Sequence, residues 1–207
     1  MSSGRETGET SRHAVRDVYV ARTVKNPQDK LERFQAGLSR HLGRRAVVFS
    51  MEDALHLTYL ESYGIKSRLL SLSYDLAGVR SFKTELQTYL SETLPRTGKM
   101  PIQIDSDEPL KWITTSKLAF NIVPDETLLA ERDEIEEFLV NKFGEPPSLR
   151  PFTPHITILE MRSRVREQER KDPVTMLPRG LYMPQSIAMN GLEVYLGRIA
   201  DLPARAA

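Results

Sequence analysis

The chain of 207 residues contains no cysteine. Disulfide bonds, thiolate metal sites and cysteine nucleophiles are therefore excluded, and the absence fits a reducing compartment. Long apolar runs are also missing, since no stretch approaches the length of a membrane span. Charge of one sign is not in excess: 29 Lys and Arg stand against 28 Asp and Glu, for a formal net charge of +1. This balance excludes a molecule-wide positive field for nucleic acid but leaves room for a local basic groove.

The composition is that of an ordinary soluble globular protein. Hydrophobic residues make up 40% of the chain and charged residues 28%, which is enough to bury a core. Residues 1–14 are polar, lack the apolar centre of a secretory signal and are predicted to form a disordered tail. We expect residues 15–200 to form a single domain of two lobes, residues 201–207 to form a second tail, and the protein to be cytoplasmic, away from membranes.

The apolar periodicity predicts a mixture of strands and helices, typical of an α+β protein. Helices are expected at 28–42 and 79–94, and a third is expected to begin at the N-cap Asp125 and end at Gly144. Short apolar or alternating stretches predict strands at 15–24, 46–49, 55–60, 68–76, 100–104, 110–114, 117–123 and 153–159. The Asn190-Gly191 pair predicts a hairpin joining strands at 186–189 and 192–199.

The most informative pattern is a His-x-Thr motif that occurs twice, at His56-Leu57-Thr58 and His155-Ile156-Thr157. The chain has four His residues, and two such motifs arise by chance in only a few per cent of sequences with its Thr content. Each motif lies in a predicted strand, where residues two apart point to the same face. Each strand therefore presents one imidazole beside one hydroxyl, with apolar residues on the opposite face.

Two imidazoles that face one cleft form a general acid and general base pair near neutral pH. Thr hydroxyls beside them can donate hydrogen bonds to the non-bridging oxygens of a phosphate. This set suits phosphoryl transfer without a metal. A metal site would need three or four ligands, and in simple strand geometry Glu61 and Glu160 point away from the His-Thr faces.

The two motifs together resemble the paired signature of the 2H phosphoesterase superfamily, which includes the 2′-5′ RNA ligase and cyclic phosphodiesterase group. The resemblance rests on the pair, the strand context and the helices between the motifs, and it spans roughly residues 17–199. It implies a bilobal, pseudo-symmetric α+β fold in which antiparallel sheets line a central cleft and the helices lie outside.

The resemblance also implies a function. We expect metal-independent hydrolysis of a nucleotide or RNA end that carries a 2′,3′-cyclic phosphate or a 2′-5′ linkage, without a cofactor and with the protein acting as a monomer. His56 and His155 would be the catalytic acid and base, in either order, and Thr58 and Thr157 would bind the phosphate. The alternatives are a non-catalytic module that binds nucleotides or RNA ends in the same cleft, a 2′-5′ RNA ligase, and a structural domain whose two His residues are simply buried.

Other residues carry weaker expectations. His41 belongs to the end of a predicted helix and His13 to the tail, so neither is expected to be catalytic. The basic residues of the stretch 162–172 alternate with acidic ones, which favours a solvated helix over an RNA-binding rim. Candidates for stacking a base or adding charge near the cleft are Tyr63, Trp112, Phe152, Lys117 and Arg150.

Overall fold

The computed structural model describes residues 18–50, 55–60, 76–94, 100–144 and 152–196. In this part of the chain the elements follow an α+β order, with strands and helices interspersed along the sequence. No helix among the described residues combines the length and apolar character needed to cross a bilayer.

The strands of the described residues form one antiparallel sheet. Their order is β4-β8-β1-β3-β7-β6-β5, and β2 pairs with β7 beside this path. The strands are β1 (Val18–Val24), β2 (Ala46–Val48), β3 (His56–Leu60), β4 (Met100–Gln103), β5 (Leu110–Trp112), β6 (Lys117–Asn121), β7 (His155–Met161) and β8 (Ser186–Leu196). The predicted α+β class and antiparallel pairing are thus confirmed, with the two halves joined into one sheet where β3 meets β7.

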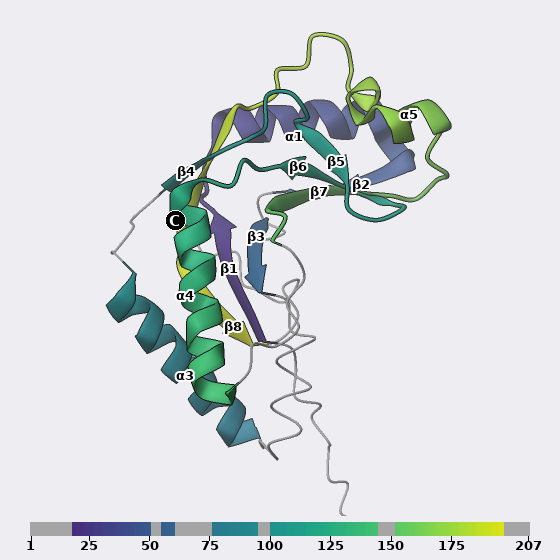
Figure 1. Cartoon of the computed structure of the whole chain (residues 1–207). Helices are drawn as coiled ribbons and strands as arrows, with labels where there is room; N and C mark the ends of the chain where they lie inside the picture. Colours follow the sequence, from purple (N-terminus) through teal and green to yellow (C-terminus); the bar gives the residue numbers. More distant parts are fainter. Residues whose placement is uncertain (1–17, 51–54, 61–75, 95–99, 145–151, 197–207) are drawn as a thin grey trace, which may run out of the picture.

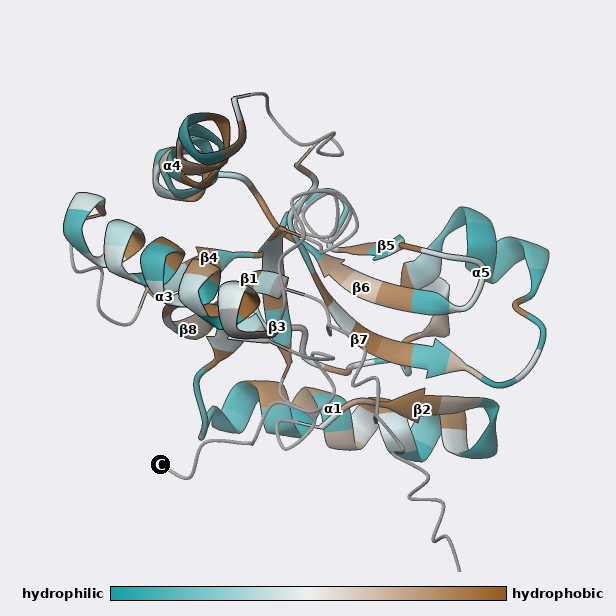
Figure 2. Cartoon of the chain, turned by 90° about the horizontal axis from the view of Figure 1, so that it is seen from below, coloured by the Kyte–Doolittle hydropathy of each residue, from teal (hydrophilic) through white to brown (hydrophobic). Residues whose placement is uncertain are grey.

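Three long helices cover the sheet: α1 (Asp29–Leu42), α3 (Leu76–Thr93) and α4 (Glu126–Phe143). Each shows both hydrophobic and hydrophilic residues around its circumference (Figure 2). The predicted ends of α4 are confirmed. Asp125 accepts a hydrogen bond from the backbone N–H of Leu128, and Gly144 adopts the left-handed conformation, φ 76°, that favours glycine.

The helices lie on opposite halves of the sheet (Figure 1). Helix α1 follows β1 but packs against the other half, where Phe34 meets Phe120 of β6 with ring centroids 5.3 Å apart. Helices α3 and α4 lie side by side near β1 and β8, in contact through Phe82 and Phe138 at 5.9 Å. Each half of the sheet is therefore covered by a helix that follows a strand of the other half.

The short elements after β7 are α5 (Glu167–Lys171) and a 3₁₀ turn, η3 (Pro173–Met176), while another 3₁₀ turn, η1 (Gly43–Arg45), follows α1. Helix α5 agrees with the solvated helix favoured for the charged stretch. The predicted tails and most of the predicted strand 68–76 lie outside the described residues, and Leu76 itself begins α3.

The predicted hairpin at Asn190-Gly191 is wrong, because residues 186–196 form one continuous strand, β8. The strand changes partners at this point. Its first residues pair with β4 and its last with β1, and the β1–β8 register is irregular between Arg22 and Val24. The Asn190 side-chain amide donates to the Thr23 hydroxyl of β1 at 2.9 Å. This polar group thus has its partner on a neighbouring strand and not within a turn.

Candidate active site

The two motif strands, β3 and β7, are neighbours at the centre of the sheet. They pair antiparallel, with Leu57 opposite Ile156. Both of these side chains are completely buried. Residues opposite each other in an antiparallel pair point to the same face, so the middle residue of each motif faces the same core.

The four polar residues of the motifs therefore share the other face of the sheet. Continuing the Leu57–Ile156 register by one residue in each direction sets His56 opposite Thr157 and Thr58 opposite His155. All four side chains are partly exposed. His56 and His155 then lie diagonally across the two neighbouring strands, with about 7–8 Å between their backbone positions. At this spacing both imidazoles could contact the same ligand.

A β-bulge follows each motif at the same place. The register between β1 and β3 shifts at Tyr59, and the register between β6 and β7 shifts at Ile158, in each case the residue after the Thr. A bulge places two consecutive side chains on one side of the strand. Ile158 and Leu159 are accordingly both buried. The two motifs thus share a backbone irregularity as well as a sequence pattern.

The strands flanking the motifs are also equivalent. Ala21 of β1 lies opposite Thr58, and Ala119 of β6 lies opposite Thr157. Two residues further along, Thr23 lies opposite His56 and Asn121 lies opposite His155. Each motif Thr therefore has a small neighbour, and each motif His has a polar neighbour on the same face. Thr23 and Asn121 join the candidate site on this ground.

The ring orientation of His155 is fixed by its own loop. Its Nδ1 lies 2.8 Å from the carbonyl oxygen of Thr153. A carbonyl can only accept, so Nδ1 carries the proton and Nε2 carries the lone pair when the ring is neutral. This arrangement suits a ring that exchanges its proton at Nε2.

Lys111 of β5 brings a positive charge to the same face. It lies opposite Ala119, which in turn lies opposite Thr157. Its ammonium donates to the carbonyl oxygen of Pro154 at 3.2 Å, one residue before His155. Burial lowers the pKa of Lys111, while the charge of Asp105 acts in the opposite direction.

A buried charge network lies behind β3, on the core face. The guanidinium of Arg22, opposite Leu57, donates to Glu131 of α4 and to the backbone oxygen of Asn190, the latter at 2.7 Å. The Tyr59 hydroxyl also donates to Glu131. Burial and the Glu131 carboxylate raise the pKa of Tyr59, which keeps the hydroxyl protonated. The network ties α4 to the strand that carries the first motif.

The aromatic candidates serve the interior. Phe152 stacks on Tyr59 with ring centroids 5.5 Å apart. Trp112 lies opposite Leu118, on the core face, and its indole N–H donates to the backbone oxygen of Glu169 at 2.9 Å. Neither contact leaves the ring as a platform on the His-Thr face. Tyr63, like Arg150, Glu61 and His13, lies outside the described residues.

Two further expectations have different outcomes. His41 is exposed in the last turn of α1, as predicted. Glu160 was expected on the face away from His155 and Thr157, and this is wrong. The bulge at Ile158 resets the alternation, so that Glu160, opposite Lys117, returns to the face of Thr157. Among the described residues, no group of three or more His, Asp or Glu is arranged to hold a metal ion.

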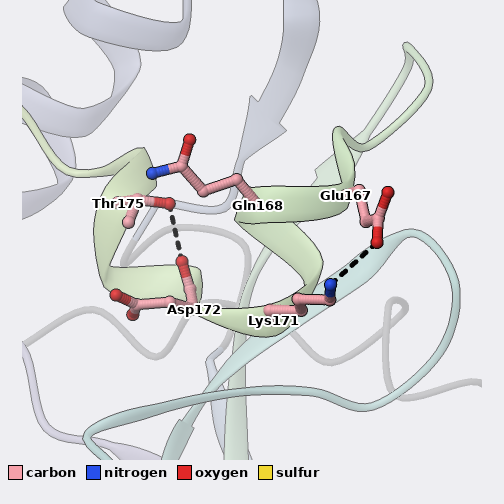
Figure 3. A pocket seen from close by; sticks show the side chains of 5 residues that line it. All are labelled: Glu167, Gln168, Lys171, Asp172 and Thr175. Atoms are coloured by element: carbon pink, nitrogen blue, oxygen red, sulfur yellow. Dashed lines mark hydrogen bonds and ion pairs between the residues drawn. The ribbon is translucent and has the colours of Figure 1, made fainter.

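A separate hollow of about 410 Å³ lies beside α5 and η3, lined by Glu167, Gln168, Lys171, Asp172 and Thr175 (Figure 3). None of these residues belongs to a motif strand. Lys171 forms an ion pair with Glu167 at 2.8 Å, and the Thr175 hydroxyl donates to the Asp172 carbonyl at 2.7 Å. These contacts are made within the exposed segment itself, and the candidate site remains the His-Thr face.

The fold is shared with known structures. A curled antiparallel sheet with helices outside it, and with β3 and β7 paired at its centre, is a LigT-like and phosphoesterase-like fold. No family model matches the chain, and no curated protein matches it.

Particular solved structures carry this likeness. A phosphoesterase crystal structure aligns with a TM-score of 0.53 over 87% of this chain and 88% of its own. LigT of E. coli, crystallised with ATP, aligns with a TM-score of 0.52 over 88% of both chains. The protein TT0787 of Thermus thermophilus aligns with a TM-score of 0.54 over 85% of this chain and 86% of its own. Each is 14% identical to this chain, so the likeness concerns the fold.

Sequence reasoning identified the motif residues but missed Lys111, Thr23 and Asn121. Lys111 carried one local signal, since it alternates with the apolar Leu110 and Trp112 and must face away from them. The signal does not say which strand lies beside it. Thr23 and Asn121 carried no such signal in the sequence, because they join the candidate site only through the motif strands that they lie opposite.

Proposed function

We propose that this chain is a metal-independent phosphodiesterase that acts on nucleotides or RNA ends carrying a 2′,3′-cyclic phosphate or a 2′-5′ linkage. The observation that carries the proposal is the pairing of Leu57 with Ile156. This single pairing gives both motifs one common face, on which two imidazoles and two hydroxyls would surround one phosphate.

In the proposed reaction one imidazole takes a proton from water, and the water oxygen forms a bond to phosphorus. The bond from phosphorus to the leaving ester oxygen breaks, and the other imidazole, protonated, gives its proton to that oxygen. His155 acts through Nε2, since its Nδ1 proton is held by the Thr153 carbonyl. The identity of the leaving oxygen decides which of His56 and His155 is the base.

Thr58 and Thr157 would stabilise the charge that develops on the non-bridging oxygens. Each hydroxyl lies opposite the His of the other motif, so each would donate to the phosphate from the side across from one imidazole. A nucleotide as ligand is also consistent with the complex of E. coli LigT with ATP, a protein of the same fold.

The test is hydrolysis of 2′,3′-cyclic nucleotides and of 2′-5′-linked oligoadenylate in the presence of a chelator. We expect the wild type to hydrolyse at least one of them, and the double variant His56→Ala/His155→Ala to lose about 10⁴-fold or more in kcat/KM. The matched control is His41→Ala, which removes an exposed imidazole from α1 and should leave turnover unchanged.

Equal rates for the wild type and the double variant would overturn the proposal. Nucleotide binding that survives the loss of both imidazoles, without turnover of either substrate, would instead support a non-catalytic binding module on the same face.

A further inference from the structure

Lys111 stands at the end of a row of side chains that crosses the candidate site. Thr157, Ala119 and Lys111 occupy directly opposed positions on β7, β6 and β5, so they share one face. Ala119, whose side chain is a single methyl group, occupies the position between Thr157 and Lys111. With neighbouring strands about 4.8 Å apart, the lysine backbone is about 10 Å from that of Thr157, and a lysine side chain spans much of that distance.

The lysine ammonium lies close to the second motif. Its contact with the Pro154 carbonyl, at 3.2 Å, is made to the residue that precedes His155. In the described part of the chain no carboxylate forms an ion pair with the Lys111 ammonium, although the charge of Asp105 acts to raise its pKa. Asp105 is committed elsewhere: one carboxylate oxygen accepts from the backbone N–H groups of Asp107 and Glu108 at 2.8 and 3.0 Å.

The position equivalent to Lys111 in the other half of the sheet carries the opposite charge. Glu193 of β8 lies opposite Ala21, which lies opposite Thr58. The row through the first motif Thr therefore ends in a carboxylate, while the row through the second ends in an ammonium. The two ends of this face therefore carry side chains of opposite charge.

We propose that Lys111 is a specificity-determining residue that binds a second phosphate of the substrate, next to the phosphodiester that the motif residues hold. The inference rests on the proposed function and deepens it. The preferred substrate is a nucleotide or RNA end with a further phosphate, oriented so that this phosphate lies toward β5, in preference to a nucleoside with a single cyclic phosphate.

The test is equilibrium binding of adenosine 2′,5′-bisphosphate and adenosine 2′-phosphate, measured by isothermal titration calorimetry on the full chain. We expect the wild type to bind the bisphosphate about tenfold more tightly, as one charge-assisted contact allows. Lys111→Gln should reduce this preference to about twofold or less, while Lys111→Arg, which keeps the charge, should retain most of it.

Lys171→Gln is the charge-matched control, since Lys171 is exposed on α5 and paired with Glu167. It should leave the preference intact. An unchanged affinity of Lys111→Gln for adenosine 2′-phosphate shows that the variant is folded and its motif face is complete.

Several outcomes overturn the inference: no preference in the wild type, a preference that survives in Lys111→Gln, or an equal loss of affinity for both nucleotides in that variant. Binding is independent of turnover, so the two proposals fail separately. A Lys111-dependent preference without hydrolysis of any diester overturns the proposed function alone, and hydrolysis without the preference overturns this inference alone.

Discussion

Thr58 and Thr157 are the residues whose roles are easiest to separate from packing. Each lies on the exposed face of its strand, opposite an alanine on one side and the other motif's His on the other. Both are partly exposed, and neither belongs to the buried core. Removing a hydroxyl here changes the chemistry of the face with little effect on the fold.

We therefore expect Thr157→Val to lower kcat by about 10²-fold, the usual effect of removing one donor to a developing negative charge. Thr157→Ser, which keeps the hydroxyl, should stay within about tenfold of the wild type. Steady-state kinetics with a 2′,3′-cyclic nucleotide measure both, and thermal unfolding should show both variants folded. A Val variant as active as the Ser variant would remove Thr157 from the proposed mechanism.

The buried ion pair of Arg22 and Glu131 concerns the stability of the fold and not the chemistry of the candidate site. Both side chains are almost fully buried, so removal of one partner leaves the other charge in an apolar surrounding. We expect Glu131→Met to lower the free energy of unfolding by about 3 kcal/mol or more. The double variant Arg22→Met/Glu131→Met should lose less than the sum of the single losses. Urea unfolding measures all three, and Glu137→Gln, on the exposed side of α4, is the control.

Additive losses would show that the two charges are not coupled across the interface between β1 and α4. The equivalent position of the other half contains Phe120 packed on Phe34, so the fold accepts an apolar contact at this place.

At the scale of elements, one carboxylate joins α5 to η1, the turn that leads into β2. Glu169 is buried and accepts from the Arg45 guanidinium at 2.8 and 3.0 Å and from the Arg166 backbone N–H at 2.8 Å. Burial by itself raises the pKa of Glu169, but the hydrogen bonds and charges of the two arginines outweigh it and lower the pKa. The folded state therefore favours the ionised carboxylate of Glu169.

A lowered pKa in the folded state means that the stabilisation is complete above the unfolded value, near 4.5, and is lost as the pH falls through the folded value. We expect Glu169→Gln to be less stable than the wild type by about 1–2 kcal/mol at pH 7, with the difference shrinking below about pH 4.5. Urea unfolding at several pH values tests this. A difference independent of pH would show that the charge of Glu169 does not act.

The elements also show what a sequence can predict. The ends of α4 were predictable because Asp125 and Gly144 act within one helical turn of the residues they cap. The hairpin at Asn190-Gly191 was wrongly predicted because its outcome depends on Thr23 and Arg22, which lie on another strand. The motif residues could be found from the sequence because their pattern is repeated. The position of Lys111 beside the second motif could not, because it depends on the register of β5, β6 and β7.

At the scale of the whole molecule, the two halves of the sheet are not built by two halves of the sequence. Strands β1 and β3, from the first half of the chain, lie between β8 and β7, from the second half. Strand β2 adds to β7 in the same manner. The helices are exchanged as well, since α1 covers β6 and α4 covers β1.

A chain divided at position 97 should consequently give two fragments that depend on each other. We expect residues 1–97 and 98–207 to be largely unfolded when separate, and an equimolar mixture to recover the native near-ultraviolet circular dichroism and the binding of adenosine 2′-phosphate. The fragments purified alone are the control. A fragment that folds cooperatively alone would contradict the interleaved sheet.

The pairing of β1 with β8 has a consequence for biosynthesis. Arg22 and Asn190, in contact across these strands, are 168 residues apart in the chain. While a ribosome makes the protein, β1 emerges long before β8, so its second neighbour is missing until residues 186–196 have been made. Contacts of such long sequence separation slow folding, and an unpaired strand edge can bind other chains in the meantime. The nascent chain thus carries an open edge at β1 until β8 has been made, a natural place for a chaperone to act.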